Sequence, residues 1–182
     1  MCGQFHRRRE LDECVMFRGR FIALGDSALR RLRSAKGDPA RRRVMEDLEE
    51  ESHDHVDTDK AWYILYICFL DGNLRRKRRP KVDLETLALL FRGARCLHRG
   101  DSYVINAIDA GDVAAVAAAL DQLDRKWLVA RYHSLDPKYF CAGDYTSTKQ
   151  QADYTWLWFT RMRAFFDRHC SSGMHIVFSS QF

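Results

Sequence analysis

The fold is centred on residues 57–70, which read DTDKAWYILYICFL. Asp57 or Thr58 is predicted to cap a helix over about residues 59–70, because short polar side chains accept hydrogen bonds from the free N–H groups at a helix start. This helix is apolar on nearly all sides, which predicts a central position in the core. Its apolar run, Ala61–Leu70, would rise only about 15 Å as a helix, about half of a bilayer core, and this excludes a transmembrane span.

The flanking sequence predicts strands and further helices around this segment. Runs rich in β-branched and aromatic residues predict strands over residues 15–24, 102–108 and 174–179. Apolar residues at spacings of three and four predict the other helices, near residues 26–35, 40–51, 83–91, 112–123, 125–132 and 154–170. Strands at the start, middle and end of the chain must meet in one sheet. We therefore predict a single α+β domain, in which a small sheet of about three or four strands packs against about six helices.

Length and composition agree with one globular domain. The chain has 182 residues, of which 46% are hydrophobic and 30% are charged, so it can bury a sizeable core, and this composition argues against long disordered segments. We assign residues 15–182 to the domain and residues 1–14 to an N-terminal extension. No apolar stretch follows the basic residues near the N-terminus, so we expect no secretory signal and a cytoplasmic location.

Charge is concentrated in two blocks. Residues 46–59 hold eight Asp or Glu and no Lys or Arg, whereas residues 75–81, RRKRRPK, hold six basic residues. The acidic block is interpreted either as a polar helix face followed by a loop, or as a docking surface for a basic cleft in another protein. The basic block is interpreted as an exposed loop. No aromatic residue interleaves with it, which argues against base stacking but leaves phosphate contact open.

The sequence lacks the motifs of common enzymes and cofactor sites. It has no glycine-rich phosphate loop, no GxSxG and no HExxH. His169 and Cys170 are neighbours on a predicted helix and point in different directions, so they do not form a catalytic dyad. The His and Asp residues of 53–59 lack a diagnostic metal-ligand spacing. We therefore predict no catalytic residue, no metal site and no cofactor.

The chain resembles the YfbM-like family, a bacterial domain of unknown function, over about residues 15–182. The stretches that carry the likeness are Met16-x-Arg18-Gly19-x-Phe21, Asp57-x-Asp59-Lys60-Ala61-Trp62, Val113–Leu123 with Leu128 and Tyr132, and Phe159–Phe166 with the closing strand. The resemblance implies a compact α+β domain and supplies no reaction. Small bacterial domains of this kind also occur as immunity proteins beside toxins.

The chain departs from the family pattern beside its most specific stretch. The family tends to have histidines where this chain has Tyr63 and Tyr66, and a Thr-Gly pair where this chain reads Leu70-Asp71-Gly72. If those positions serve a site shared by the family, that site is altered in this protein.

The leading functional hypothesis is a non-catalytic immunity or antitoxin-type protein that blocks the basic active-site cleft of a toxin enzyme. The predicted partner-binding residues combine the acidic block with a neighbouring aromatic helix face: Glu49, Glu50, Asp57, Asp59, Lys60, Trp62 and Tyr66. An alternative is an enzyme or ligand-binding domain with a pocket near Asp57–Trp62. A weaker alternative is a nucleic-acid binder that uses Arg75–Lys81.

Overall fold

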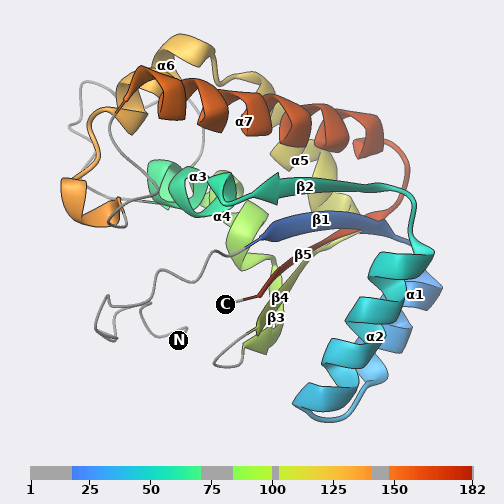
Figure 1. The fold of residues 1–182 in the computed structure, drawn as a ribbon. Coiled ribbons are helices and arrows are strands. Elements are labelled where there is room, and N and C mark those ends of the chain that lie inside the picture. The colour runs from blue at the N-terminus through green and yellow to red at the C-terminus, as the bar shows by residue number, and fades with distance from the viewer. Residues whose placement is uncertain (1–17, 71–83, 100–102, 141–147, 182) are drawn as a thin grey trace.

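The computed structural model describes residues 18–70, 84–99, 103–140 and 148–181 (Figure 1). The predicted extension 1–14, the first residues of the predicted strand 15–24 and the basic block 75–81 lie outside the described residues. The strands are β1 (Gly19–Leu24), β2 (His55–Asp59), β3 (Arg95–Arg99), β4 (Tyr103–Ile108) and β5 (His175–Gln181). The helices are α1 (Asp26–Ser34), α2 (Asp38–Glu51), α3 (Ala61–Leu70), α4 (Leu84–Arg92), α5 (Ala110–Asp121), α6 (Arg125–Tyr132), the 3-10 turn η2 (Pro137–Tyr139) and α7 (Lys149–His169).

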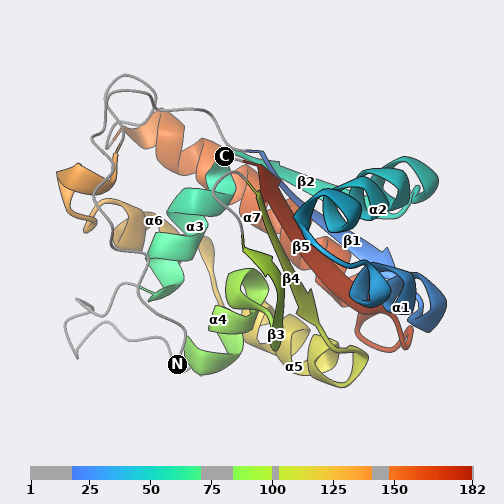
Figure 2. The same ribbon diagram turned by 90° about the horizontal axis from the view of Figure 1, so that it is seen from below.

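The strands form one antiparallel sheet in the order β2-β1-β5-β4-β3. β5, the last strand in the sequence, lies in the middle and pairs with β1 on one side and β4 on the other (Figure 2). In the register, Arg20 of β1 lies opposite both Asp57 of β2 and Ser179 of β5. Residues from three distant parts of the chain thus meet in one row across the sheet.

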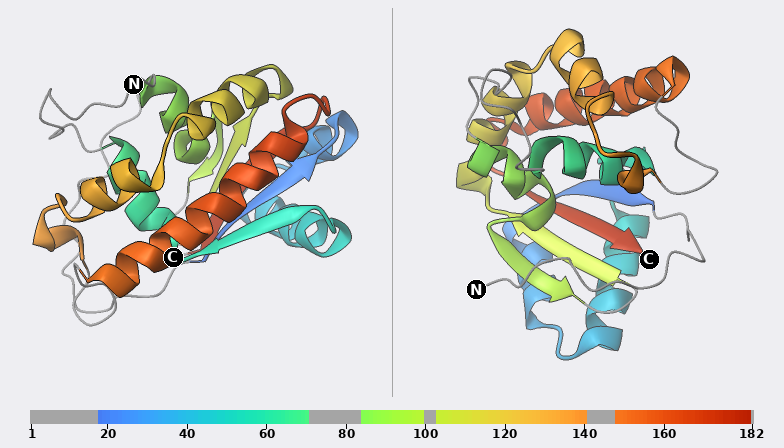
Figure 3. Two further views of the ribbon diagram at one scale, coloured as in Figure 1. Left: turned by 90° about the horizontal axis from the view of Figure 1, so that it is seen from above. Right: turned by 90° about the vertical axis from the view of Figure 1, so that its left-hand side faces the viewer.

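Helices cover both faces of the sheet, but unequally. Helices α3 to α7 cover one face, and the α1–α2 hairpin covers the other (Figures 1 and 3). Side chains alternate between faces along a strand, so Phe21 and Phe178 point toward the larger helical layer, whereas Ile22 and Val177 point toward α1 and α2. We call these the helix-layer face and the hairpin face.

The predicted single α+β domain is confirmed, and within the described residues its sheet has five strands rather than three or four. The two strands that the sequence analysis missed, β2 and β3, are the edges of the sheet. Their sequences, HVDTD and RCLHR, are charged and poor in apolar residues. Charged residues are common on edge strands because they discourage pairing with other chains, and here they hide the strand pattern.

The predicted start of the central helix was wrong. Asp57 and Thr58 belong to β2, and the buried Thr58 hydroxyl donates a hydrogen bond of 2.9 Å to the Gly19 carbonyl instead of capping a helix. Asp59 ends the strand with a φ of 46°, and α3 begins at Ala61. No helix within the described residues is long and apolar enough to cross a membrane.

Candidate functional site

The predicted partner-binding residues do not form one continuous face. Glu49 and Asp57 meet on the hairpin face of the sheet, where both contact Arg20. Asp59 turns to the helix layer, where its carboxylate accepts a hydrogen bond of 2.5 Å from the Tyr154 hydroxyl of α7. Glu50 is exposed on α2. The segment 46–59 therefore runs along the outside of the hairpin and then down an edge of the sheet.

The predicted aromatic recognition face is part of the core, because α3 is enclosed by other elements. Trp62 is only 5% exposed, and its ring lies 5.4 Å from that of Phe178 and 6.2 Å from that of Phe91, measured between centroids. Tyr66 is half-buried and packs edge-on against Phe91 at 5.9 Å. These rings stabilise the helix-layer face and do not extend the acidic block outward.

Gly19 explains how Trp62 fits against the sheet. A Cβ atom at this position would lie 2.7 Å from the Trp62 ring and 2.8 Å from the Thr58 hydroxyl, closer than real Cβ contacts allow. The absence of a side chain lets the indole rest on the β1 backbone. This close approach fixes the turn from β2 into α3, and with it the position of Asp59.

The acidic surface, as we call residues 46–57, combines the C-terminal half of α2 with β2 and the link between them. Carboxylates near a helix C-terminus are unfavourable because the helix dipole is negative there. Arginines offset this cost: Arg31 of α1 contacts Asp47 at 2.7 Å and Glu51 at 3.0 Å, and Arg42 contacts Glu46 at 2.8 Å. The α1–α2 hairpin is therefore held together partly by charge.

The α2–sheet junction, as we call Arg20, Glu49, Asp57, Tyr103 and Ser179, lies where this surface meets the sheet. The Ser179 hydroxyl donates to Glu49 Oε1 at 2.7 Å, and Arg20 Nε donates to Asp57 Oδ1 at 2.6 Å. The bond with Asp57 raises the pKa of Arg20 despite partial burial. Five elements supply these side chains, so the junction exists only in the folded chain.

Tyr103 is the most enclosed member of the junction. It is 2% exposed, and its hydroxyl has no hydrogen-bond partner among the described residues. Burial, followed by the negative charge of Glu49, raises the pKa of the Tyr103 phenol, so the hydroxyl stays protonated. A buried, neutral hydroxyl without a partner is uncommon in folded proteins.

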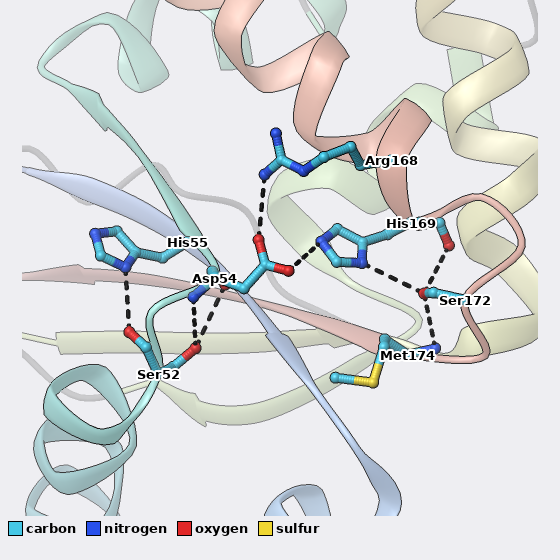
Figure 4. A network of polar contacts seen from close by, with 7 residues as sticks. All are labelled: Ser52, Asp54, His55, Arg168, His169, Ser172 and Met174. Atoms are coloured by element: carbon cyan, nitrogen blue, oxygen red, sulfur yellow. Dashed lines mark hydrogen bonds and ion pairs between the residues drawn. The ribbon is translucent and has the colours of Figure 1, made fainter.

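A second polar network joins the acidic surface to the end of α7 (Figure 4). Asp54 contacts Arg168 at 3.1 Å and the Nε2 of His169 at 3.0 Å. Burial opposes ionisation of Asp54, but the contacts with His169 and Arg168 outweigh it and lower the pKa of the carboxyl. Cations near a helix C-terminus are also favoured by the helix dipole. The network thus fastens α7 to the start of β2.

The order Ser172, His169, Asp54 in this network resembles a hydrolase triad, but the serine is engaged otherwise. The Ser172 hydroxyl donates to the His169 carbonyl at 3.0 Å and accepts from the Met174 amide at 3.2 Å, which closes the end of α7. The His169 side chain is only 8% exposed. His169 Nδ1 lies 3.3 Å from the Ser172 hydroxyl, but that hydroxyl is bonded to the backbone on both sides, so we interpret the network as a structural closure of α7.

The His and Asp residues of 53–59 have separate partners. The His55 ring donates to the Ser52 carbonyl at 3.3 Å, Asp54 faces α7, and Asp57 binds Arg20. Within the described ranges, no group of three His, Cys, Asp or Glu residues is placed to hold a metal ion.

Sequence reasoning missed most of the α2–sheet junction. Arg20, Tyr103 and Ser179 lie in strands that were predicted correctly at least in part, but a strand pattern does not say which residues stand side by side. The sequence offered only a weak signal: Arg20 and Ser179 are polar residues that directly adjoin the apolar parts of β1 and β5.

A family model described as "Domain of unknown function (DUF1877)" matches residues 17–179. The chain belongs to the DUF1877 family. Among solved structures, this DUF1877 chain is similar to a protein of unknown function, YfbM from Escherichia coli, with 17% sequence identity and a TM-score of 0.61. The similarity covers 91% of this chain and 99% of that chain. No curated protein matches the chain.

The predicted resemblance to the YfbM-like family is confirmed by these matches. At 17% identity, the likeness to YfbM establishes a shared fold, and neither description gives a DUF1877 domain a function. A functional argument for this chain therefore depends on its own residues.

Proposed function

We propose that the protein is a non-catalytic binding protein that neutralises a partner enzyme by occupying its active site, as an immunity or antitoxin protein does. The observation that carries the proposal is the acidic surface. Its carboxylates lie on a helix end and an edge strand, two elements at the outside of the fold. Such a surface is complementary to a basic cleft that normally binds a phosphate-bearing substrate.

The charge distribution supports a docking role more than a role in folding. Acids at the C-terminus of α2 oppose the helix dipole, and Arg31 of α1 offsets two of them, Asp47 and Glu51. Glu50 remains exposed on the outer side of this helix. A fold that needed only a stable hairpin would gain from basic residues at this position.

The alternative of a small-molecule site near Asp57–Trp62 has one observation in its favour. Asp59 has a positive φ of 46°, a conformation that is uncommon for residues other than glycine and is found more often at functional sites. The neighbouring Trp62 is in the core, which leaves less side-chain surface for a ligand. We therefore rank this alternative second.

The proposal is tested by capturing the partner and measuring its activity. The tagged full-length protein is used to isolate partners from its native host at moderate salt, and any captured enzyme is assayed with increasing amounts of the protein. We expect inhibition that is complete near a one-to-one ratio. A captured enzyme that stays fully active, or the absence of any stoichiometric partner, would contradict the proposal.

A charge reversal distinguishes a specific effect of the acidic surface from the effect of the protein's net charge. Glu50→Lys changes an exposed residue on the acidic surface, so we expect association about tenfold slower and a weaker dependence on salt. Asp121→Lys is the matched control, because Asp121 is exposed at the end of α5 in the helix layer, on the other side of the sheet. Equal effects of the two reversals would argue against a specific acidic docking surface.

A further inference from the structure

The Tyr103 hydroxyl is a buried hydrogen-bonding group without a partner among the described residues. The side chain is 2% exposed, so the hydroxyl is removed from bulk water. Its charged neighbours are Glu49, Glu46 and Arg42, and the Ser179 hydroxyl lies close enough to lower its pKa, although no hydrogen bond of full geometry joins the two hydroxyls. A buried polar group of this kind calls for a partner, and the described part of the chain does not supply one.

Glu49 also has a carboxylate oxygen here that forms an ion pair but no hydrogen bond. Its Oε1 accepts the Ser179 hydroxyl at 2.7 Å, but its Oε2 lies 3.6 Å from Arg20, beyond hydrogen-bond distance. Arg20 is instead held by Asp57 at 2.6 Å. Ser179 contacts Glu49 and neighbours Tyr103, so the carboxylate from α2 and the hydroxyl from β4 lie near the same serine.

The charge and exposure of the α2–sheet junction favour a cation. Its two carboxylates, Glu49 and Asp57, face one guanidinium, Arg20, and Glu46 is already paired with Arg42. The side chain of Asp57 is 45% exposed, that of Arg20 31% and that of Glu49 20%, whereas Tyr103 as a whole residue is 2% exposed. The junction thus extends from a half-exposed carboxylate at the acidic surface to an enclosed phenol.

We infer that the α2–sheet junction binds one basic side chain, a lysine or an arginine, that the partner protein inserts as it docks on the acidic surface. The cation donates one hydrogen bond to Glu49 Oε2 and another to the Tyr103 oxygen, and both bonds are charge-assisted. This inference rests on the proposed function and deepens it by naming the group that is recognised. Interface energy commonly concentrates in such an enclosed anchor, surrounded by weaker charged contacts.

The site is tested directly with small cations that carry the same groups. Methylammonium and methylguanidinium chloride are titrated into the isotope-labelled full-length protein and followed by NMR. Tetramethylammonium, which has the same charge but no N–H, is the control ligand, at matched ionic strength. We expect saturable shifts at the Tyr103 ring and the Ser179 amide, with a Kd of about 1–10 mM, for the first two cations only. Equal shifts with all three cations, or no localised shift, would overturn the inference.

Two near-isosteric variants locate the binding. Glu49→Gln removes the charge but keeps an oxygen that can accept the Ser179 hydroxyl, so the fold is retained. Tyr103→Phe removes only a hydroxyl that has no partner in the described chain. We expect methylguanidinium binding to weaken at least about tenfold in the first variant and about three- to tenfold in the second, while Asp121→Asn leaves it unchanged. Unchanged binding in both junction variants would contradict the site.

The same variants distinguish this inference from the proposed function. A captured enzyme could be inhibited equally well by wild type, Glu49→Gln and Tyr103→Phe, but less well by Glu50→Lys. That result would contradict binding of a basic side chain at the α2–sheet junction and would support docking on the acidic surface. If methylguanidinium binds at the junction but no enzyme is captured, the site stands as a cation site and its partner role fails.

Discussion

The two faces of the sheet are built from the same strands but differ in chemistry. On the helix-layer face, Phe21 and Phe178 join a continuous apolar core with α3 to α7. On the hairpin face, apolar packing under α1 and α2 gives way to Arg20, Ser179 and Tyr103. One face therefore supplies most of the burial that stabilises the fold, and the other combines apolar packing with a cluster of charged and polar side chains.

This difference assigns stability and recognition to opposite sides of one sheet. Adjacent residues in a strand point to opposite faces, so each strand contains its own comparison: Arg20 with Phe21 in β1, and Ser179 with Phe178 in β5. Substitutions of two adjacent residues in one strand therefore test the two faces at nearly the same position in the fold.

The largest expected effect comes from such a pair in β1. Phe21→Ala removes a fully buried ring that contacts Phe91, Phe166 and Phe178, so we expect a loss of about 3–5 kcal/mol in the free energy of unfolding. Arg20→Ala, one residue away, removes a partly exposed ion pair and is expected to cost at most about 1 kcal/mol. Urea denaturation of both variants provides the measurement, and similar losses would contradict the division between the faces.

Sequence periodicity predicted the helices of the helix-layer face because the spacing of apolar residues along a helix is a local signal. The spacing of Leu120 from Val116 and Val113, or of Phe166 from Met162, specifies a buried helix stripe without knowledge of the partner element. The same rule failed for β2 and β3, whose charged residues show no apolar alternation. It also misplaced the aromatic side chains of α3, because a helix that is apolar on all sides does not reveal which side is exposed.

The α2–sheet junction could not be predicted from the sequence because its members are far apart along the chain. Ser179 lies 130 residues from the Glu49 that it contacts, and Asp57 lies 37 residues from Arg20. Only the sheet order, with β5 between β1 and β4, brings these side chains together. Prediction of that order requires long-range pairing, which local propensity does not encode.

A smaller effect on stability is expected from the ion pairs that join Asp54, between α2 and β2, to the end of α7. Asp54 follows the hairpin, and its partners Arg168 and His169 end α7. Because the folded-state pKa of Asp54 is lowered from 3.8, its stabilising effect is present above that value and is lost as pH falls through the folded pKa. Asp54→Asn should therefore be destabilised by at most about 1 kcal/mol near neutral pH, because the pair is half exposed.

The difference between wild type and Asp54→Asn should narrow steadily as urea denaturation is repeated at pH values below about 4. Asp121→Asn controls for the change in net charge, since Asp121 is exposed at the end of α5. A difference that grows toward acid pH would mean that the Asp54 carboxylate is not the stabilising species.

The smallest effect on stability is expected at the residue proposed to matter most for binding. The hydroxyl removed by Tyr103→Phe has no partner among the described residues, so the free energy of unfolding should change by less than about 0.5 kcal/mol or increase. Thr58→Val is the matched control: Thr58 is fully buried, and its hydroxyl donates to the Gly19 carbonyl at 2.9 Å, so its loss should cost about 1–3 kcal/mol. Equal costs in the two variants would mean that Tyr103 is hydrogen-bonded in the free protein, and the hydroxyl would then not be available to a partner. A stable Tyr103→Phe protein that has lost cation binding would instead show that the hairpin face retains this hydroxyl for recognition.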